Sequence, residues 1–123
     1  MIENLYELVG GQQIIEDATE RFYHKVLEDG NLRQFFSGTD MAHLRSRQVM
    51  FIMMLLGGGV YTGKDIGAAH ARARGHGLND AHFDLFLDHF RAALEEVGVK
   101  SENVGKIIKF LERRRRSVLT GFT

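Results

Sequence analysis

Apolar residues recur three and four positions apart along most of this chain, which is the spacing of one face of an α-helix. Between Gln12 and Asp29 the repeating residues are Ile15, Ala18, Phe22 and Val26, and Gly30 ends the segment. The chain has no proline, and most of its glycines are concentrated at a few points between the periodic segments. The pattern therefore predicts an all-α fold.

Glycines and residues that commonly cap helices give the ends of the predicted segments. We find no repeat, linker or low-complexity segment, and predict a single domain over residues 1–123. The predicted helices, in chain order, are Asn4–Val9, Gln12–Asp29, a turn at Leu32–Phe36, a helix that begins after Thr39 or Asp40 and ends at Gly57, a short turn at about Asp65–Ala73, a helix capped by Asn79 that ends near Val97, and a last helix capped by Ser101.

Composition and charge narrow the class of protein. The 123 residues are 44% hydrophobic and 26% charged, which is typical of one compact soluble domain. Lysines and arginines number 16, as do aspartates and glutamates, and this neutral balance weighs against nucleic acid or an anionic membrane as the main partner. The absence of cysteine excludes disulfides and thiolate metal sites.

The chain carries no signal for export or for membrane insertion. Glu3 and Glu7 interrupt the N-terminal segment, so no secretory signal is visible. The longest apolar run, Val49–Leu56, is far shorter than the roughly 20 residues that a membrane-spanning helix needs. We expect a cytoplasmic protein without a membrane span.

Four consecutive arginines, Arg113 to Arg116, are the most conspicuous charge run. On a helix they point in four directions and do not form one basic stripe. We therefore expect a solvated last turn that complements the helix dipole, rather than a binding site for nucleic acid or membrane.

Two hydrogen-bonding side chains lie among apolar ones on different predicted helices. Gln48 shares a helix face with Leu44, Phe51 and Leu55, and a buried amide without a partner costs about 1–3 kcal/mol. Taken alone, Gln48 is expected to reach the edge of the core or to bond to a nearby carbonyl. Tyr23, next to an apolar helix face, also points inward. The two side chains either bond to each other or hold a small polar guest between them.

The histidines indicate which kind of group could bind near these two side chains. Five of the six read as surface or ordinary core residues, and no pair has the spacing of a zinc site. His70 differs, because "DIGAAHARA" surrounds it with small residues that would let a flat group approach. One histidine, an apolar slot and two opposed hydrogen-bonding groups fit haem, whose porphyrin supplies most of the iron ligands. The alternative is a helical interaction domain that binds no haem.

Several motifs together resemble those of group I truncated haemoglobins along the whole chain. They are "LYELVGG", "RFYHKVLED", "LRQFFSGTDM", "RQVMFIMMLLGGGVYTG", "GAAH" and "HFDLF". The chain lacks the tryptophan that is typical of the penultimate helix in groups II and III. The resemblance implies a truncated globin, a two-over-two helical sandwich around haem b.

The resemblance also implies roles for single residues. His70 matches the proximal ligand of the haem iron, and Phe36 matches the phenylalanine that packs on the haem face. Tyr23 matches the distal tyrosine that donates to bound O2, and Gln48 matches the glutamine that supports it. A buried Gln48 is then explained, since bound O2 carries partial negative charge and accepts strong hydrogen bonds.

Further positions complete the implied pocket. Leu44 matches a gate residue above the haem, and Arg47 matches a position that in some relatives holds a histidine or lysine able to bind the iron. A guanidinium cannot do so, and we therefore expect a five-coordinate ferrous iron with Arg47 turned toward a haem propionate. The remaining candidate haem-binding residues are Phe35, Phe51, Leu55 and Tyr61.

The functional expectation is reversible O2 binding at the haem iron. The distal set is closest to that of mycobacterial relatives that convert nitric oxide and bound O2 to nitrate, which makes this oxidation the candidate enzymatic activity. It would require an electron-donating reductase, with O2, NO and CO as gaseous ligands and a monomeric chain. The alternative is an O2 or NO sensor or store without turnover.

Overall fold

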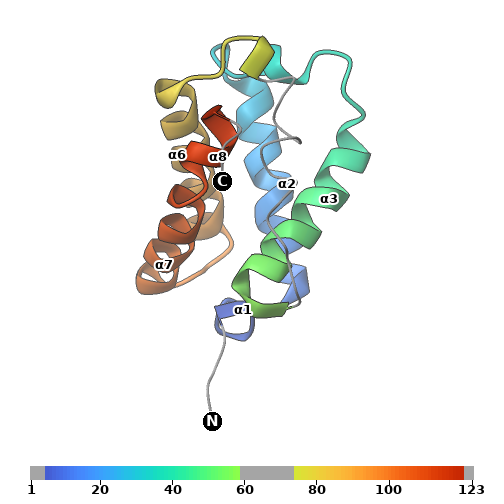
Figure 1. Ribbon diagram of the computed structural model, residues 1–123. Coiled ribbons are helices and arrows are strands. Elements are labelled where there is room, and N and C mark those ends of the chain that lie inside the picture. Colours follow the sequence, from blue (N-terminus) through green and yellow to red (C-terminus); the bar gives the residue numbers. More distant parts are fainter. Residues whose placement is uncertain (1–4, 59–73, 121–123) are drawn as a thin grey trace.

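The structure, a computed structural model, describes residues 5–58 and 74–120, and all regular structure in those ranges is helical (Figure 1). The all-α prediction is therefore confirmed. In chain order the elements are α1 (Leu5–Leu8), α2 (Gln12–Glu28), the 3-10 helix η1 (Arg33–Phe36), α3 (Met41–Met53), the π-helical turn η2 (Met54–Gly58), α6 (Asp80–Glu96), α7 (Ser101–Glu112) and α8 (Arg115–Thr120).

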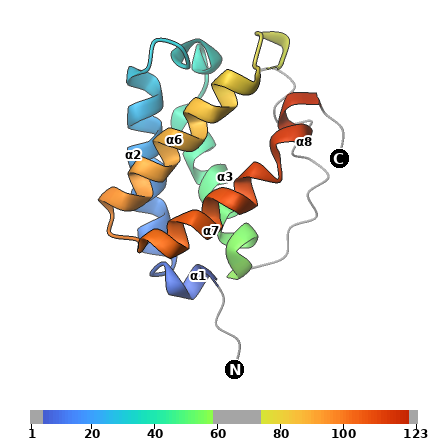
Figure 2. The same cartoon turned by 90° about the vertical axis from the view of Figure 1, so that its left-hand side faces the viewer.

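The long helices form two layers of two. Helix α2 packs against α3 within one layer and against α6 of the other, and α7 packs against α6. Figure 2 shows α6 and α7 lying across α2 and α3. This arrangement is the predicted two-over-two sandwich. No helix in the described ranges is long and apolar enough to cross a membrane.

The core lies between the layers and uses the faces that the periodicity predicted. The buried residues of α2 include Ile15, Ala18, Phe22 and Val26, all at most 8% exposed. One polar residue among them, Thr19, donates from its hydroxyl to the Ile15 carbonyl at 2.7 Å. The opposite layer contributes its own buried residues, which are Phe83, Phe90, Ala93, Leu94, Val104, Ile107 and Ile108.

Side-chain caps begin two of the long helices. The Asp40 carboxylate accepts a hydrogen bond from the His43 backbone at 3.2 Å, and Asn79 accepts one from the His82 backbone at 3.1 Å. The His82 ring returns the bond by accepting from the Asn79 backbone. The expected cap at Asn79 is confirmed, as is Asp40 as one of the two expected candidates.

The expected cap at Ser101 is wrong. Lys100 is the N-cap of α7, and Ser101 is the first helical residue. The Lys100 carbonyl accepts bonds from the backbone of Asn103 and Val104, both at 2.9 Å, so the helix begins one residue earlier without a side-chain cap.

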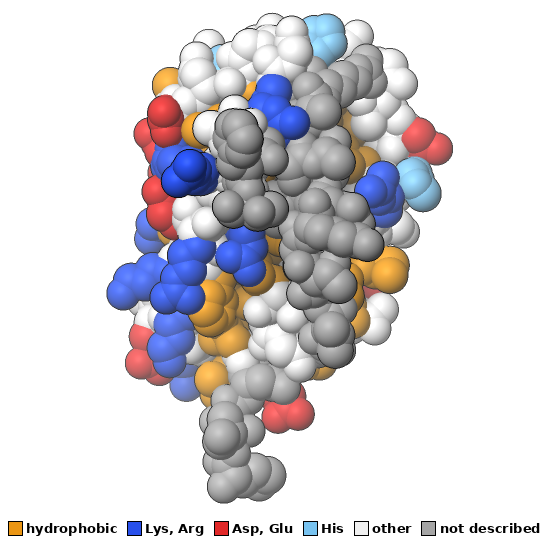
Figure 3. Space-filling view, in the orientation of Figure 1, with side chains coloured by type: hydrophobic (Ala, Val, Ile, Leu, Met, Phe, Trp, Pro, Cys, Tyr) orange, Lys and Arg blue, Asp and Glu red, His pale blue; other side chains and the backbone are white. Residues whose placement is uncertain are grey.

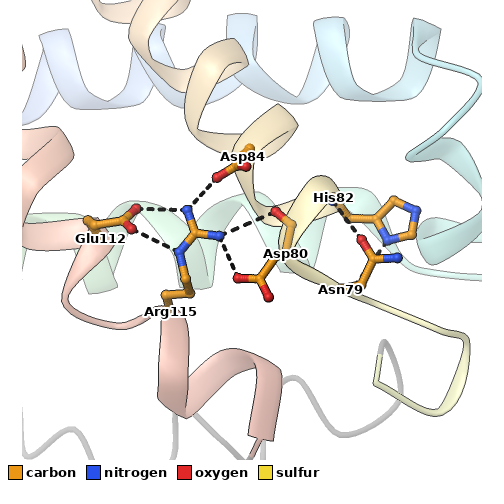
Figure 4. Close-up of polar contacts among 6 residues, drawn as sticks. All are labelled: Asn79, Asp80, His82, Asp84, Glu112 and Arg115. Carbon is orange, nitrogen blue, oxygen red and sulfur yellow. Dashed lines mark hydrogen bonds and ion pairs between the residues drawn. The ribbon is translucent and has the colours of Figure 1, made fainter.

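The arginine run does not continue the last long helix. Helix α7 ends at Glu112, and α8 begins at Arg115 and returns toward α6. Arg115 forms ion pairs with Glu112, Asp80 and Asp84 (Figure 4). Its guanidinium also lies 4.6 Å from the centre of the Phe83 ring. Its side chain is only 22% exposed. The expectation of a solvated terminal turn is therefore wrong for Arg115, because the helix break brings it onto the carboxylates of α6.

Basic residues are concentrated at the C-terminal end. Residues 100–120 hold seven of the 16 lysines and arginines but only two of the 16 acidic residues. Figure 3 shows basic side chains gathered on the side where α7 lies. We call this surface the basic face; its exposed members that make no ion pair in the described parts of the chain are Lys100, Lys106, Lys109, Arg113 and Arg116.

Candidate functional site

Tyr23 lies in the middle of α2 and is 4% exposed. Its ring makes edge-on contacts with Phe22, at 4.8 Å between ring centres, and with Phe36, at 5.9 Å. Burial raises the pKa of its hydroxyl well above the ordinary value, and the opposing effect of the Arg45 charge is smaller. Tyr23 therefore stays a neutral hydrogen-bond donor at any physiological pH.

Phe36 connects Tyr23 to the other helical layer. It is half-buried at the end of η1, and its ring lies 6.1 Å from that of Phe86 in α6. Phe35, which is buried, contacts Phe86 at 6.3 Å and the His82 ring at 4.9 Å. The two neighbouring phenylalanines thus fix η1 against α6, and one of them, Phe36, also touches Tyr23.

The predicted face of α3 is present, but it is only half-buried. Leu44, Gln48 and Phe51 are all half-buried, as is Leu55 in η2, whereas Arg47 is exposed. The half-burial of Gln48 agrees with the edge position expected from its helix face alone, and Gln48 is less buried than the family resemblance implies. Because burial is partial, the amide avoids the full cost of desolvation, and a ligand on this face could complete the burial of its apolar neighbours.

Tyr23 and Gln48 do not bond to each other. Within residues 5–58 and 74–120, the structure contains no hydrogen bond between the phenol and the carboxamide, nor from the phenol to any other residue. Of the two interpretations left open by the sequence, direct pairing across the core is absent. Among the described residues the Tyr23 hydroxyl therefore keeps its proton available for a ligand that supplies an acceptor atom.

Four of the histidines other than His70 are either exposed or already bonded. His43 and His76 are exposed, the His82 ring takes part in the cap of α6, and the His89 ring bonds to Asp29. No group of three or more potential metal-ligating side chains occurs in the described ranges.

The fifth of these histidines, His24, forms an ion pair with Glu28, and its side chain is 75% exposed. His70 and Tyr61, the predicted proximal ligand and a predicted pocket residue, lie outside the described residues.

The described residues fit the haem that the resemblance implies. Three features suit a flat apolar group that carries a small ligand with partial negative charge: an apolar row on α3 and η2, the half-buried Phe36, and a neutral phenol without an acceptor among the described residues. Of the predicted site residues, Tyr23 and Phe36 are in contact, and Leu44, Gln48 and Phe51 share the half-buried face of α3. Arg47 lies at the exposed border, consistent with a role toward the charged edge of such a group.

Two residues near this site were not identified from the sequence. Arg45, whose charge acts on Tyr23, gave no signal because an arginine on an amphipathic helix is ordinarily a surface residue. Phe86 lies in the helix predicted to follow Asn79, and no local signal assigned it to this site. Its contact with Phe36 depends on how the layers cross, which periodicity does not specify.

Comparisons with known proteins agree with this fold. Residues 4–120 match a family model described as bacterial-like globin. A group 1 truncated hemoglobin of Tetrahymena pyriformis is 36% identical over 118 residues, which cover 95% of each chain. A group 1 truncated hemoglobin of Mycolicibacterium paratuberculosis is also 36% identical, over 96% of this chain and 85% of its own.

Solved structures resemble the fold closely. The Fe(III) form of truncated hemoglobin from Tetrahymena pyriformis gives a TM-score of 0.86 at 36% identity, over 95% of this chain and 98% of that one. The 2/2 hemoglobin of Synechococcus sp. PCC 7002, in the cyanomet state with covalently attached heme, gives a TM-score of 0.89 at 32% identity with the same coverage.

Proposed function

The chain belongs to the group 1 truncated haemoglobins of the bacterial-like globin family, and from this premise we propose that it holds haem b noncovalently and binds O2 reversibly at a five-coordinate iron. As a globin it binds haem and diatomic gases. The proposal extends to one globin domain over residues 1–123, acting as a cytoplasmic monomer.

His70 is the proposed iron ligand. It stands in the "GAAH" segment that resembles the proximal motif of the family. The engagement or exposure of the other five histidines supports this choice. The proposed pocket also includes Phe35, Phe36, Leu44, Phe51, Leu55 and Tyr61, with Arg47 paired to a haem propionate.

The observation that carries the proposal is Tyr23, a buried residue whose neutral hydroxyl has no acceptor among residues 5–58 and 74–120. When bound, haem supplies the iron that binds the gas and gives up one electron when nitric oxide and dioxygen combine to nitrate. Tyr23 donates its phenolic proton in a hydrogen bond to the partially negative dioxygen, and Gln48 adds an amide donor from α3. Leu44 and Phe51 keep water away, which strengthens both bonds.

We further propose oxidation of nitric oxide to nitrate as the activity of this site. The distal set of Tyr23, Leu44 and Gln48 supports it through its resemblance to mycobacterial relatives, one of which is 36% identical to this chain. Each turnover leaves the protein one electron short, so the cycle requires a reductase. A sensor or store for O2 or NO, without turnover, is the second candidate.

Stopped-flow mixing of the O2-saturated ferrous protein with nitric oxide tests the activity. Rapid formation of nitrate, one per haem, is the expected result. Slow or substoichiometric nitrate would refute oxidation and favour the store or sensor.

Absorption spectroscopy tests separately whether His70 binds the iron and whether the unliganded ferrous iron is five-coordinate. We expect a Soret band for the wild-type chain supplied with hemin and none for His70→Ala. We expect the unliganded ferrous spectrum to be high-spin and five-coordinate, because the Arg47 guanidinium keeps its charge and does not ligate. Low-spin bands in that state would contradict the assignment.

Noncovalent attachment has its own test. The structural neighbour from Synechococcus carries covalently attached heme, whereas residues 101–123 of this chain contain no histidine that could form such a bond from the last helices. Acidified organic solvent should therefore extract the haem completely. Colour that stays with the protein would contradict this.

A further inference from the structure

The corner between α2 and η1 is organised around Asp29. One carboxylate oxygen of Asp29 accepts a hydrogen bond from the Asn31 backbone at 2.8 Å. Its backbone carbonyl accepts from the amides of Leu32 and Arg33, both at 3.0 Å. Three of the amides that shape the corner therefore depend on this residue, and we call residues 29–36 the α2–η1 corner.

The second carboxylate oxygen of Asp29 is bonded to the other layer. His89 of α6 places its Nε2 at 2.8 Å from Asp29 Oδ2, and the two side chains are only 25% and 14% exposed. The His89 hydrogen bond is the main cause that lowers the pKa of Asp29. The carboxylate is thus ionised near neutral pH, and Nε2 must carry a proton and donate it.

The surroundings do not compete for this bond. Lys25 and Glu28 of α2 and Ala92 of α6 line the same surface depression of about 370 Å³. Lys25 is committed to an ion pair with Glu96, one turn of α6 away from Ala92. His89 and Asp29 therefore form a separate connection between the layers, placed at the end of α2 rather than along its length.

The α2–η1 corner carries the aromatic residues of the proposed site. The Phe35 amide donates to the Leu32 carbonyl at 3.1 Å, which ties η1 to the turn formed by Asp29. The next residue, Phe36, is the one whose ring lies edge-on to Tyr23. A displacement of the corner relative to α6 would therefore shift a side chain that holds the distal phenol.

We propose that His89 is a positioning residue for the gas site, acting through Asp29. Its hydrogen bond holds the α2–η1 corner against α6, which keeps the Phe36 ring on Tyr23 and the phenol aimed at the bound gas. The inference rests on the proposed function, since it needs a gas at that place. It assigns to His89 a role in ligand release although it does not touch the ligand.

The test compares wild type with His89→Ala in the chain as purified with its haem. Amide hydrogen exchange at Asn31 and Leu32 should become about tenfold faster, since a charge-assisted bond that restrains the corner is lost. The C–O stretching band of the CO-saturated ferrous protein should shift and broaden as Tyr23 loses its fixed orientation. Release of O2 should accelerate about three- to tenfold.

Two further variants separate positioning from general destabilisation. His89→Gln keeps a neutral donor and should restore most of the wild-type exchange rate and C–O band. His24→Ala is the matched control, because His24 also pairs with a carboxylate, Glu28 at 3.1 Å, but is 75% exposed and does not connect to the corner. It should behave as wild type in all three measurements.

Wild-type exchange in His89→Ala would overturn the proposal, and so would faster exchange with an unchanged C–O band and unchanged O2 release. If His89→Ala does not fold, Asp29→Asn serves instead, since it keeps an oxygen for the Asn31 amide and should change the same quantities less. A chain that takes up no haem would refute the proposed function, while the exchange measurement would still report on the corner.

Discussion

In the proposed site, the hydroxyl of Tyr23 is the main hydrogen-bond donor to the bound gas. The same burial that keeps its pKa high also keeps its proton available for donation. Two ring contacts, with Phe22 and Phe36, restrict where the hydroxyl can point. A donor that is already restricted in orientation loses less conformational entropy when a ligand binds. A single phenol can therefore be the main determinant of the rate at which O2 is released.

Tyr23→Phe is therefore expected to accelerate O2 release about 10- to 100-fold, since a hydrogen bond to a charged partner contributes about 1.5–3 kcal/mol. The stability of the folded chain should hardly change, because the hydroxyl bonds to no described residue. Displacement of O2 by CO in a stopped-flow instrument measures the rate. A release rate equal to that of wild type would remove Tyr23 from the site.

Gln48→Leu provides the companion measurement on α3. Its effect on O2 release should be smaller than that of Tyr23→Phe, because Gln48 is half-buried and competes with water for its hydrogen bonds. Leucine has a similar volume, so packing against Leu44 and Phe51 is retained. A larger effect than that of Tyr23→Phe would reverse the order of importance proposed for the two donors.

Among the helices, α6 makes the most varied connections. Its first residues are capped by Asn79 and covered by Arg115, its middle contacts the phenylalanines of η1, and His89 reaches the α2–η1 corner. Each connection joins it to a different element. The helix thus relates the two layers to each other, and its position affects the site although none of the predicted distal donors belongs to it.

The contribution of the Arg115 contacts to the stability of the fold can be measured by replacing Arg115. Arg115→Met should lower the free energy of unfolding by about 1–3 kcal/mol, from three partly exposed ion pairs and the contact with the Phe83 ring. Arg116→Met, an exposed neighbour in the same run, should change it by less than about 0.5 kcal/mol. Urea unfolding of the two variants gives the comparison, and equal effects would mean that the Arg115 contacts do not stabilise the fold.

Asp29 gives the fold a pH dependence of known sign. Its pKa is lowered in the folded chain, mainly by the bond from His89, so the stabilisation is present above the ordinary aspartate pKa of about 4 and is lost as pH falls through the lower folded value. Urea unfolding of wild type and Asp29→Asn between pH 7 and pH 3 should show a stability difference that shrinks below about pH 4. A difference independent of pH would contradict this account.

Local signals in the sequence predicted the helices better than their connections. Asp40 and Asn79 have short polar side chains immediately before apolar periodicity, and both cap helices. Ser101 carries the same signal, but the chain enters its helix through the Lys100 backbone. The break that creates α8 has no local marker, because it is stabilised by contacts between Arg115 and acidic residues up to 35 positions earlier in the chain.

At the scale of the whole molecule, the periodicity predicted which helix faces are buried, and the resemblance to truncated haemoglobins implied the two layers. Tyr23 and the α3 row are on the faces that periodicity assigned to them. The degree to which Gln48 is buried did not follow, because exposure at the edge of a layer depends on what the other segments cover. The bond between Asp29 and His89 joins residues 60 positions apart, and neither one has a distinctive local pattern.

The basic face also has a consequence for the molecule as a whole. Outside residues 100–120 the chain carries nine basic and fourteen acidic residues, so its zero net charge conceals two oppositely charged regions. At pH 7 and low salt the protein should therefore adsorb to a cation exchanger, and elute at about 0.1–0.2 M salt, where charges are screened beyond about 10 Å. Lys106→Glu should weaken adsorption more than Arg33→Glu, an equal charge change on η1.

Equal adsorption of those two variants would show that only total charge matters. Otherwise the molecule acts as a permanent electric dipole, which turns in the field of any negatively charged surface so that its C-terminal helices arrive first.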